Sequence, residues 1–159
     1  MKVKKRYFLK KKKIKEIKKA LGDYETLIKN KDKVEVLETE PNNFILINGE
    51  PNIILIDNKP YPTLKALLNN PEIKNNTVTV DMGAVKFMTK GADVMSPGIT
   101  EADENIKPGD IVQIVDETHH KPLAIGISML TGEEMVENTS GKAIETLHYV
   151  GDKIWEFEI

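Results

Sequence analysis

The apolar residues of this chain fall into short runs separated by turn-forming residues, which confines it to short strands and helices. The longest runs, residues 44–47 and 53–56, have the length of a short β-strand. Neither approaches the roughly 18 apolar residues that a membrane span requires, and lysines occupy the N-terminus where an export signal has an apolar segment. The chain has no cysteine, which excludes disulfides and zinc ribbons. We therefore expect a cytoplasmic protein that does not enter a membrane.

The first half of the chain has the pattern of a β-meander followed by a helix. Three β-rich runs are separated by turn residues, and these runs are 34–37, 44–47 and 53–56. The connections contain Pro41 and Asn48-Gly49, which favour tight turns, so we expect the strands to pair in antiparallel fashion. Thr63 then precedes a short leucine-rich segment that stops before Pro71, which predicts a short helix.

The charge of the chain is segregated along its length. The sequence has 23 basic and 25 acidic residues in all, and residues 1–21 hold 11 of the basic ones with Glu16 as their single acid, a balance of +10. The other 138 residues therefore hold 12 basic and 24 acidic residues, a balance of −12. A basic segment on an acidic body favours a polyanionic partner.

The basic segment also has helical spacing, with apolar residues from Tyr7 to Ile28 that recur every three, four or seven positions. We expect one amphipathic helix over this range, broken near Gly22. Lysines crowded at the start of a helix repel one another and oppose its macrodipole, so stability alone does not explain them. Contacts with the phosphates of a nucleic acid would explain these lysines. The alternative is a solubilising surface that contacts no partner.

The second half predicts a small β-barrel with brief helices. Strands are expected at 78–80, 111–115 and 123–129, followed by a closing hairpin of 144–150 and 154–159 hinged at Gly151. Helices are expected at 84–90 and after Thr131, which starts a capping box. The polar segment 71–77 is the candidate boundary. The fold class is therefore α+β, with an N-terminal α+β domain at 1–75 and a barrel at 76–159.

The sequence contains no convincing active site. His119-His120 is best explained as a solvated turn, because no third ligand stands at metal-binding spacing. His148 lies in a strand pattern, which favours a packed or surface histidine over a catalytic base. Ser96 has no nucleophile-elbow context, and no glycine-rich phosphate motif occurs. We expect no catalytic residue, no metal, no cofactor and no enzyme activity.

The sharpest local signal is the motif loop, residues 91–99, with Lys86-Phe87 before it. Glycines and Pro97-Gly98 let backbone amides approach a ligand closely, although a purely structural loop would use the same residues. This segment, Gly91-Ala92-Asp93-Val94-Met95-Ser96-Pro97-Gly98-Ile99, resembles the signature of PUA domains, named for pseudouridine synthases and archaeosine transglycosylases. The resemblance implies a β-barrel whose loop and preceding helix bind RNA, in several members the acceptor end of tRNA.

The resemblance implies an RNA-binding face for one set of residues, and charge adds a second set. The first set is Lys86, Gly91, Ala92, Met95, Pro97, Gly98 and Ile99, with Lys142 as a further phosphate contact. The second set, expected on the basic helix, is Lys4, Lys5, Arg6, Lys10, Lys11, Lys12 and Lys13. Phe87, Trp155 and Phe157 are candidates for stacking on bases, although for Trp155 a core position is the favoured interpretation.

Segments outside the motif loop, including residues 61–68 and 144–155, are similar to the malignant T-cell-amplified-sequence family. Its eukaryotic members pair with density-regulated protein, bind the small ribosomal subunit and act on tRNA in initiation, reinitiation or recycling. This shorter chain resembles an archaeal-type relative, in which a density-regulated-protein partner is not expected. The sequence therefore predicts binding of tRNA, ribosomal RNA or both in translation. The alternatives are an RNA-targeting subunit for a separate tRNA- or rRNA-modifying enzyme or for ribosome assembly, and a protein-interaction adaptor.

Overall fold

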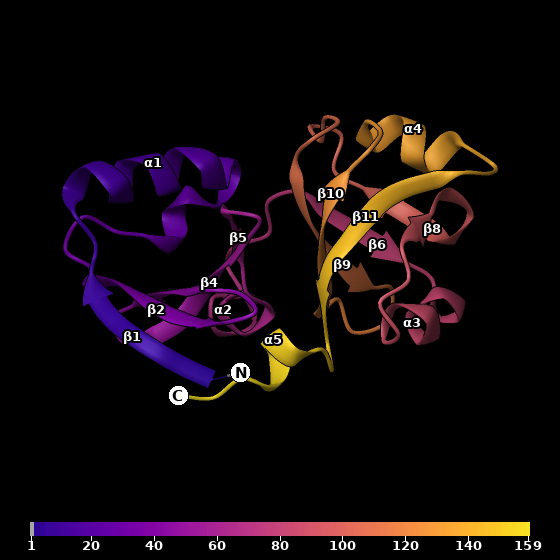
Figure 1. Cartoon of the computed structure of the whole chain (residues 1–159). Helices are drawn as coiled ribbons and strands as arrows, with labels where there is room; N and C mark the ends of the chain where they lie inside the picture. Colours follow the sequence, from indigo (N-terminus) through magenta and orange to yellow (C-terminus); the bar gives the residue numbers. More distant parts are fainter. Residues whose placement is uncertain (1) are drawn as a thin grey trace.

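The computed structural model describes residues 2–159 and arranges them around two sheets that lie side by side (Figure 1). The elements of the first half are β1 (Lys2–Phe8), α1 (Lys11–Leu21), the 3₁₀ helix η1 (Gly22–Leu27), β2 (Val34–Glu40), β3 (Phe44–Ile47), β4 (Glu50–Ile56), β5 (Lys59–Pro62) and α2 (Leu64–Asn69). Those of the second half are β6 (Thr77–Val80), α3 (Met82–Met88), β7 (Val94–Met95), the 3₁₀ helix η2 (Ser96–Gly98), β8 (Ile99–Ala102), β9 (Ile111–Asp116), β10 (Pro122–Ser128), α4 (Gly132–Glu137), β11 (Lys142–Tyr149) and α5 (Lys153–Glu156).

The first sheet is the expected antiparallel meander, extended by one strand at each end into the order β1-β2-β3-β4-β5. The helix α1 buries Ile17 and Leu21 against the sheet, and Thr63 caps α2 by accepting a bond from the Ala66 N–H, as its position predicts. The additional strand β5 follows a two-residue turn in which Asp57 and Asn58 both have positive φ. Such a turn matches the twist of a hairpin, and Asp and Asn tolerate it.

The expected helix over residues 7–28 is wrong at its start, because residues 2–8 form strand β1. Lys4, Lys5 and Arg6 therefore lie on a strand, and the helix spans only Lys11–Leu21. The acidic strand β2 explains the difference: Arg6 makes two hydrogen bonds to Glu35, and Lys4 pairs with Glu40. These cross-strand contacts are long-range, so a helical spacing within the segment does not reveal them. The break at Gly22, where φ is 57°, is as expected.

The second sheet has the order β7-β11-β10-β9-β6-β8 and curls into a barrel around a separate apolar core (Figure 1). Its strands β6, β9, β10 and β11 and its helices α3 and α4 confirm the expected barrel elements. Thr131 and Glu134 form the predicted capping box. The short strands β7 and β8 lie in a segment that the sequence predicts as loop.

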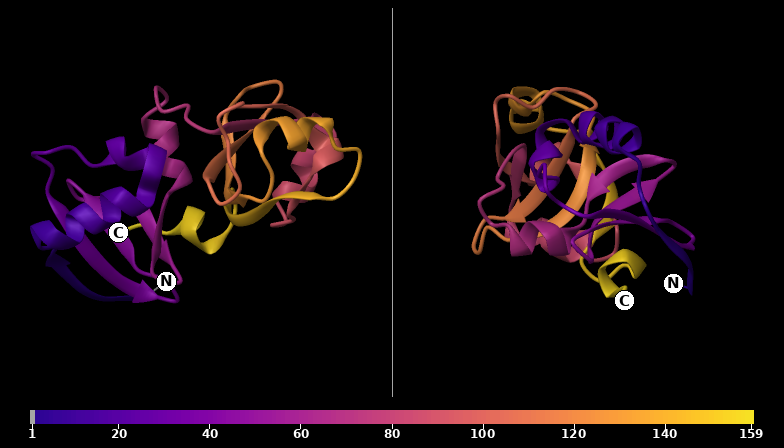
Figure 2. Two further views of the ribbon diagram at one scale, coloured as in Figure 1. Left: turned by 90° about the horizontal axis from the view of Figure 1, so that it is seen from above. Right: turned by 90° about the vertical axis from the view of Figure 1, so that its left-hand side faces the viewer.

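The expected closing hairpin is also wrong, because residues 153–156 form the helix α5. Asp152 is the cause: its carboxylate accepts a bond from the Trp155 N–H at 2.7 Å and so caps a helix start. The chain then leaves the barrel, and Phe157 stacks on Phe44 of the first sheet with ring centroids 4.5 Å apart. Figure 2 shows this C-terminal segment running alongside the N-terminal half.

The two halves share one apolar cluster. Ile125 and Phe157 of the second half are buried in the same cluster as Phe44, Ile54 and Leu64 of the first half. Among residues 2–159, no helix is long and apolar enough to cross a membrane.

Candidate nucleic-acid interface

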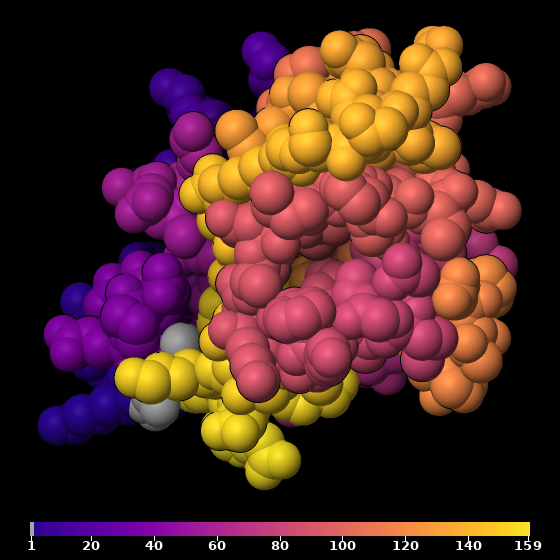
Figure 3. Space-filling view, turned by 90° about the vertical axis from the view of Figure 1, so that its right-hand side faces the viewer, coloured from indigo at the N-terminus to yellow at the C-terminus, as the bar shows by residue number. Residues whose placement is uncertain are grey.

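An apolar groove of about 480 Å³ lies between α3 and the motif loop. Its lining includes Phe87, Met88, Ala92, Met95, Pro97 and Gly98. Phe87 is 54% exposed and Met95 is 49% exposed. The space-filling view in Figure 3 shows a hollow in this face of the barrel, among the side chains of α3 and the motif loop. Large apolar side chains left in solvent around a hollow indicate a binding surface.

Local hydrogen bonds give the groove its shape. Asp81 caps α3 by accepting a bond from the Ala84 N–H at 2.9 Å, and the Asp81 N–H donates to the Gly98 carbonyl at 2.9 Å. The end of the motif loop is thereby joined to the start of the helix. A Cβ on Gly98 would lie 3.2 Å from the Ala84 Cβ, so the loop and helix approach more closely than a larger residue allows.

Gly91 has a different role. Its φ of 81° lies in the left-handed region, and a Cβ there would lie 2.7 Å from a ring carbon of Tyr149. The residue lets the chain turn after α3 while the Tyr149 ring packs against its backbone. Gly91 therefore shapes the loop without lining the groove.

An ion pair fixes the other side of the motif loop. The Asp93 carboxylate lies 2.9 Å from the Lys142 ammonium and accepts the Thr146 N–H at 2.9 Å. Partial burial opposes ionisation of Asp93, but these two donors outweigh it and hold the pKa of Asp93 below its ordinary value. The same bond raises the pKa of Lys142. Lys142 thus presents a positive charge beside the groove while its position is set by Asp93.

Only some of the RNA-binding residues that the resemblance implies lie together at the groove. Ala92, Met95, Pro97 and Gly98 line the groove. Lys86 lies with its ammonium 5.2 Å from the centre of the Phe87 ring, a cation–π geometry. Ile99 points into the barrel core instead, where it is 6% exposed.

The three aromatic candidates for base stacking differ in their exposure. Phe87 is exposed at the groove, whereas Phe157 is buried on Phe44. Trp155 is half-buried with the Lys65 ammonium 5.5 Å from its ring. Of these three residues, only Phe87 is exposed beside the motif loop. The groove lining also includes residues that were not among the predicted RNA contacts, such as Ala84, Met88 and Asp93; their positions in and beside the motif loop were the available signal.

The basic residues form a second surface on α1 and β1. Lys10, Lys11, Lys12 and Lys13 are all exposed, and Lys13 lies 3.5 Å from Glu16. On β1, Arg6 and Lys4 already pair with glutamates of β2. The bond to Glu35 raises the pKa of Arg6, and Arg6 in turn lowers the pKa of Glu35. Within residues 2–159, Lys5, Lys10, Lys11 and Lys12 make no ion pair.

The groove and the basic helix lie at opposite ends of the molecule. Figure 1 and the view from above in Figure 2 both place the start of α1 at the outer end of the first half and α3 on the outer side of the second.

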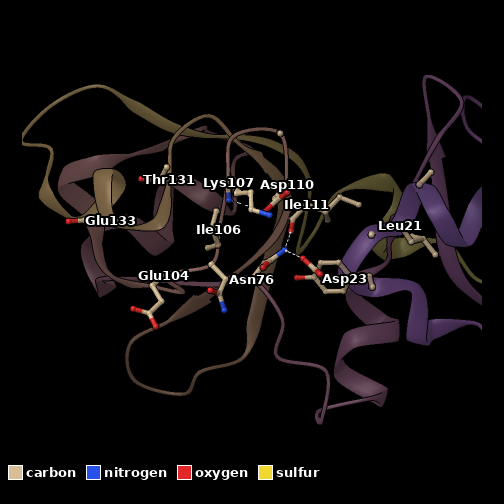
Figure 4. Close-up of a pocket in the computed structure, with 15 residues that line it drawn as sticks. Leu21, Asp23, Asn76, Glu104, Ile106, Lys107, Asp110, Ile111, Thr131 and Glu133 are labelled. Atoms are coloured by element: carbon tan, nitrogen blue, oxygen red, sulfur yellow. Dashed lines mark hydrogen bonds between the residues drawn. The ribbon is translucent and has the colours of Figure 1, made fainter.

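A polar cavity of about 840 Å³ is lined by residues of both halves (Figure 4). Asn76 spans it, donating to Asp23 and to the Ile111 carbonyl at 3.0 Å each. Glu104, Asp110 and Glu133 give its lining a mainly acidic character. Within residues 2–159, no three His, Cys, Asp or Glu residues are placed to hold a metal ion. The acidic lining makes this cavity a poor surface for phosphates.

The histidines are engaged in local contacts. His119 bonds Asp116 at 2.9 Å on the exposed turn that the sequence predicts. His148 is buried and bonds Asp152 through Nδ1 and the Leu64 N–H through Nε2. Ser96 is buried too, and its hydroxyl has no hydrogen-bond partner among the described residues.

Two family models match the chain. The model of the PUA domain matches residues 76–150, and a model described as a domain of unknown function, DUF1947, matches residues 5–70. The first match covers most of the barrel, and the second covers most of the domain that contains the first sheet.

Relatives match over nearly the whole chain. An uncharacterized protein of Methanocaldococcus jannaschii is 50% identical, covering 99% of both chains. Translation machinery-associated protein 20 of Saccharomyces cerevisiae is 34% identical over 95% of this chain and 87% of its own. Malignant T-cell-amplified sequence 1 of Rattus norvegicus is 31% identical over 83% of this chain and 75% of its own. Among solved structures, a hypothetical protein of Pyrococcus horikoshii has a TM-score of 0.86 and 38% identity, covering 96% of this chain and 98% of that one.

Proposed function

Because the chain belongs to the PUA-domain family that includes translation machinery-associated protein 20 and malignant T-cell-amplified sequence 1, we propose that it binds tRNA, the small ribosomal subunit or both. It acts in initiation, reinitiation or recycling of translation. The name of translation machinery-associated protein 20 associates that relative with the translation machinery, and the PUA domain is an RNA-binding module.

The observation that carries the proposal is the separation of two unlike surfaces. The groove offers an exposed aromatic ring, Phe87, and a flanking cation, Lys142, which suits an unpaired base and its phosphate. Stacking of a base on an aromatic ring contributes about 1–3 kcal/mol. The exposed lysines of α1 suit the phosphates of a helical or folded RNA, which they contact without reading sequence.

The chain acts by binding rather than by catalysis. This part of the proposal is supported by the engagement of His148, both of whose ring nitrogens hold structural hydrogen bonds inside the protein. His119 likewise makes its bond to the neighbouring Asp116. Neither lines the groove, and a general base must reach the group whose proton it takes.

The test is co-sedimentation of the full chain with isolated small ribosomal subunits, with and without tRNA, across a salt series. Binding that rises with tRNA and fades with salt is the expected result. Tight binding to free tRNA without any binding to the subunit, even at low salt, would overturn the ribosomal role and favour a targeting subunit for a separate RNA-modifying enzyme.

A further inference from the structure

The two edges of the first sheet differ in their capacity to pair with another strand. At the β5 edge, the Thr63 N–H donates to the Asn52 carbonyl of β4 at 2.9 Å. Backbone groups alternate in direction along a strand, so Lys59 and Tyr61 also face β4, and Pro60 and Pro62 face outward. A proline has no N–H to donate, which closes this edge to strand addition.

The β1 edge carries no such block. The Leu9 N–H donates to the Val34 carbonyl at 3.0 Å, so Leu9, Tyr7 and Lys5 face β2. By the same alternation, the N–H and C=O groups of Arg6 and Phe8 face away from the sheet. Within residues 2–159, β2 is the only strand that pairs with β1. Figure 1 shows β1 on the outer side of the first half, with no helix drawn across it.

The side chains of β1 leave apolar surface beside these free backbone groups. All seven residues of the strand are exposed, and they include Val3, Tyr7 and Phe8. Phe8 is 67% exposed. Apolar side chains on an unpaired edge favour pairing with a further strand, which would cover them.

Charge decides which strand can be added. β1 carries four cations; Lys4 and Arg6 pair with glutamates of β2, whereas Lys2 and Lys5 make no ion pair within residues 2–159. Two copies that paired through this edge would bring Lys2 and Lys5 of each copy together, which disfavours such pairing. The strand already paired with β1 shows the complementary pattern. β2 carries both apolar residues and glutamates, and its Glu35 and Glu40 pair with Arg6 and Lys4.

We propose that the outward edge of β1 binds an extended segment of a partner protein that carries both acidic and apolar residues. The segment joins the sheet as a sixth strand next to β1, bonded to the backbone of Arg6 and Phe8. Its carboxylates pair with Lys2 and Lys5, and its apolar residues cover Phe8. This is strand addition at a sheet edge, with main-chain bonds supplying affinity and charge supplying selectivity. The inference does not depend on RNA binding.

The test uses a synthetic peptide with the sequence of residues 34–40, blocked at both ends, added to the ¹⁵N-labelled full chain. We expect amide shifts centred on Arg6 and Phe8, and slower hydrogen exchange of those two amides. A second peptide with lysine in place of its three glutamates is expected to cause no shift. Equal shifts from both peptides, or none from either at millimolar concentration, would overturn the proposal.

Two variants at one position separate backbone from side chain. Phe8→Pro removes the outward N–H and the ring, and is expected to abolish binding. Phe8→Ala keeps the N–H and is expected to weaken binding by about fivefold. If Phe8→Pro fails to fold, Phe8→Glu keeps the N–H but repels the acidic peptide, and loss of binding is expected there as well. Unchanged binding in every folded variant would refute the site.

Two other occupants are distinguishable in the same experiment. A concentration-dependent dimer of the wild type, lost in Phe8→Ala, would assign the edge to a second copy and overturn the proposal. Shifts at the Arg6 and Phe8 amides produced by an RNA oligonucleotide, and not by the acidic peptide, would assign it to RNA and overturn it too.

Discussion

The Nε2 atom of His148 accepts a hydrogen bond from the backbone N–H of Leu64 at 3.0 Å, which joins the last strand of the barrel to the first turn of α2. The Nδ1–H of the same ring donates to the Asp152 carboxylate at 2.8 Å, since a neutral imidazole with an acceptor at Nε2 carries its proton at Nδ1. His148 is only 1% exposed. One buried ring therefore forms hydrogen bonds with the N-terminus of a helix in the first half and with a carboxylate in the second half.

We predict that His148→Ala lowers the free energy of unfolding by about 3 kcal/mol, because it leaves the buried Leu64 N–H and the Asp152 carboxylate without this partner. Urea unfolding measures the effect. His119→Ala is the matched control, since His119 also bonds an aspartate but lies on the surface. We expect a change below about 1 kcal/mol in the control. Equal losses in the two variants would show that the contact between the halves contributes no more than a surface pair.

Acid should weaken the same junction. Burial opposes ionisation of Asp152, but the bonds from His148 and from the Trp155 and Tyr149 N–H groups outweigh it, so the pKa of Asp152 lies below its ordinary 3.8. A lowered folded-state pKa stabilises the fold above the ordinary pKa, and that stability is lost as the pH falls through the folded-state pKa. Asp152→Asn should therefore be less stable than the wild type at neutral pH. Urea unfolding should show that the difference in free energy of unfolding between the two proteins shrinks from pH 6 to pH 2. A constant difference would contradict the prediction.

The start of α1 can be stabilised by a single change. Lys10 occupies the N-cap position and its side chain caps nothing. We predict that Lys10→Ser raises the free energy of unfolding by about 1 kcal/mol, because a serine hydroxyl accepts a backbone N–H of the first turn. Thermal unfolding measures this, with Lys31→Ser outside the helices as control. A gain in both variants would point to charge removal as the cause rather than capping.

Replacing Lys10, Lys11, Lys12 and Lys13 by glutamate should weaken binding to every RNA and reduce the salt dependence. Each lost phosphate contact reduces the slope of log K against log salt by about 0.7–0.9, so four contacts give a change of about 3. The fold should survive, because acids suit the first turn of a helix. The matched control replaces Lys29, Lys31, Lys59 and Lys74 by glutamate. Equal weakening in both variants would indicate a net-charge effect and no specific role for α1.

The groove should contribute affinity of a different kind. We predict that Phe87→Ala weakens binding of an RNA with an unpaired 3′ end by about 1–3 kcal/mol, since a stacked base is lost. The salt slope should hardly change. Gly98→Val should act in the same direction by forcing the loop away from Ala84. Met129→Ala is the control, since Met129 is also about half exposed on the barrel but lies outside the groove. Slope changes equal to those of the lysine variant would contradict the division between the two surfaces.

Local patterns in the sequence determined those parts of the protein whose interactions are local. The meander strand Phe44–Ile47, the cap at Thr63 and the capping box at Thr131 follow from residues within a few positions of one another. The groove was also accessible from the sequence, because its lining comes from the continuous segment 81–98.

Tertiary structure decided the rest, because the responsible contacts join residues far apart in the chain. Residues 2–8 are a strand because Glu35 and Glu40 of β2 pair with their cations, although the basic segment has helical spacing. The final residues leave the barrel because Phe157 finds Phe44 in the first sheet. The contact of His148 with Leu64 spans 84 positions and helps to set how the two halves meet. That packing places the basic helix and the groove at opposite ends, since local periodicity carries no information about which distant surfaces become buried together.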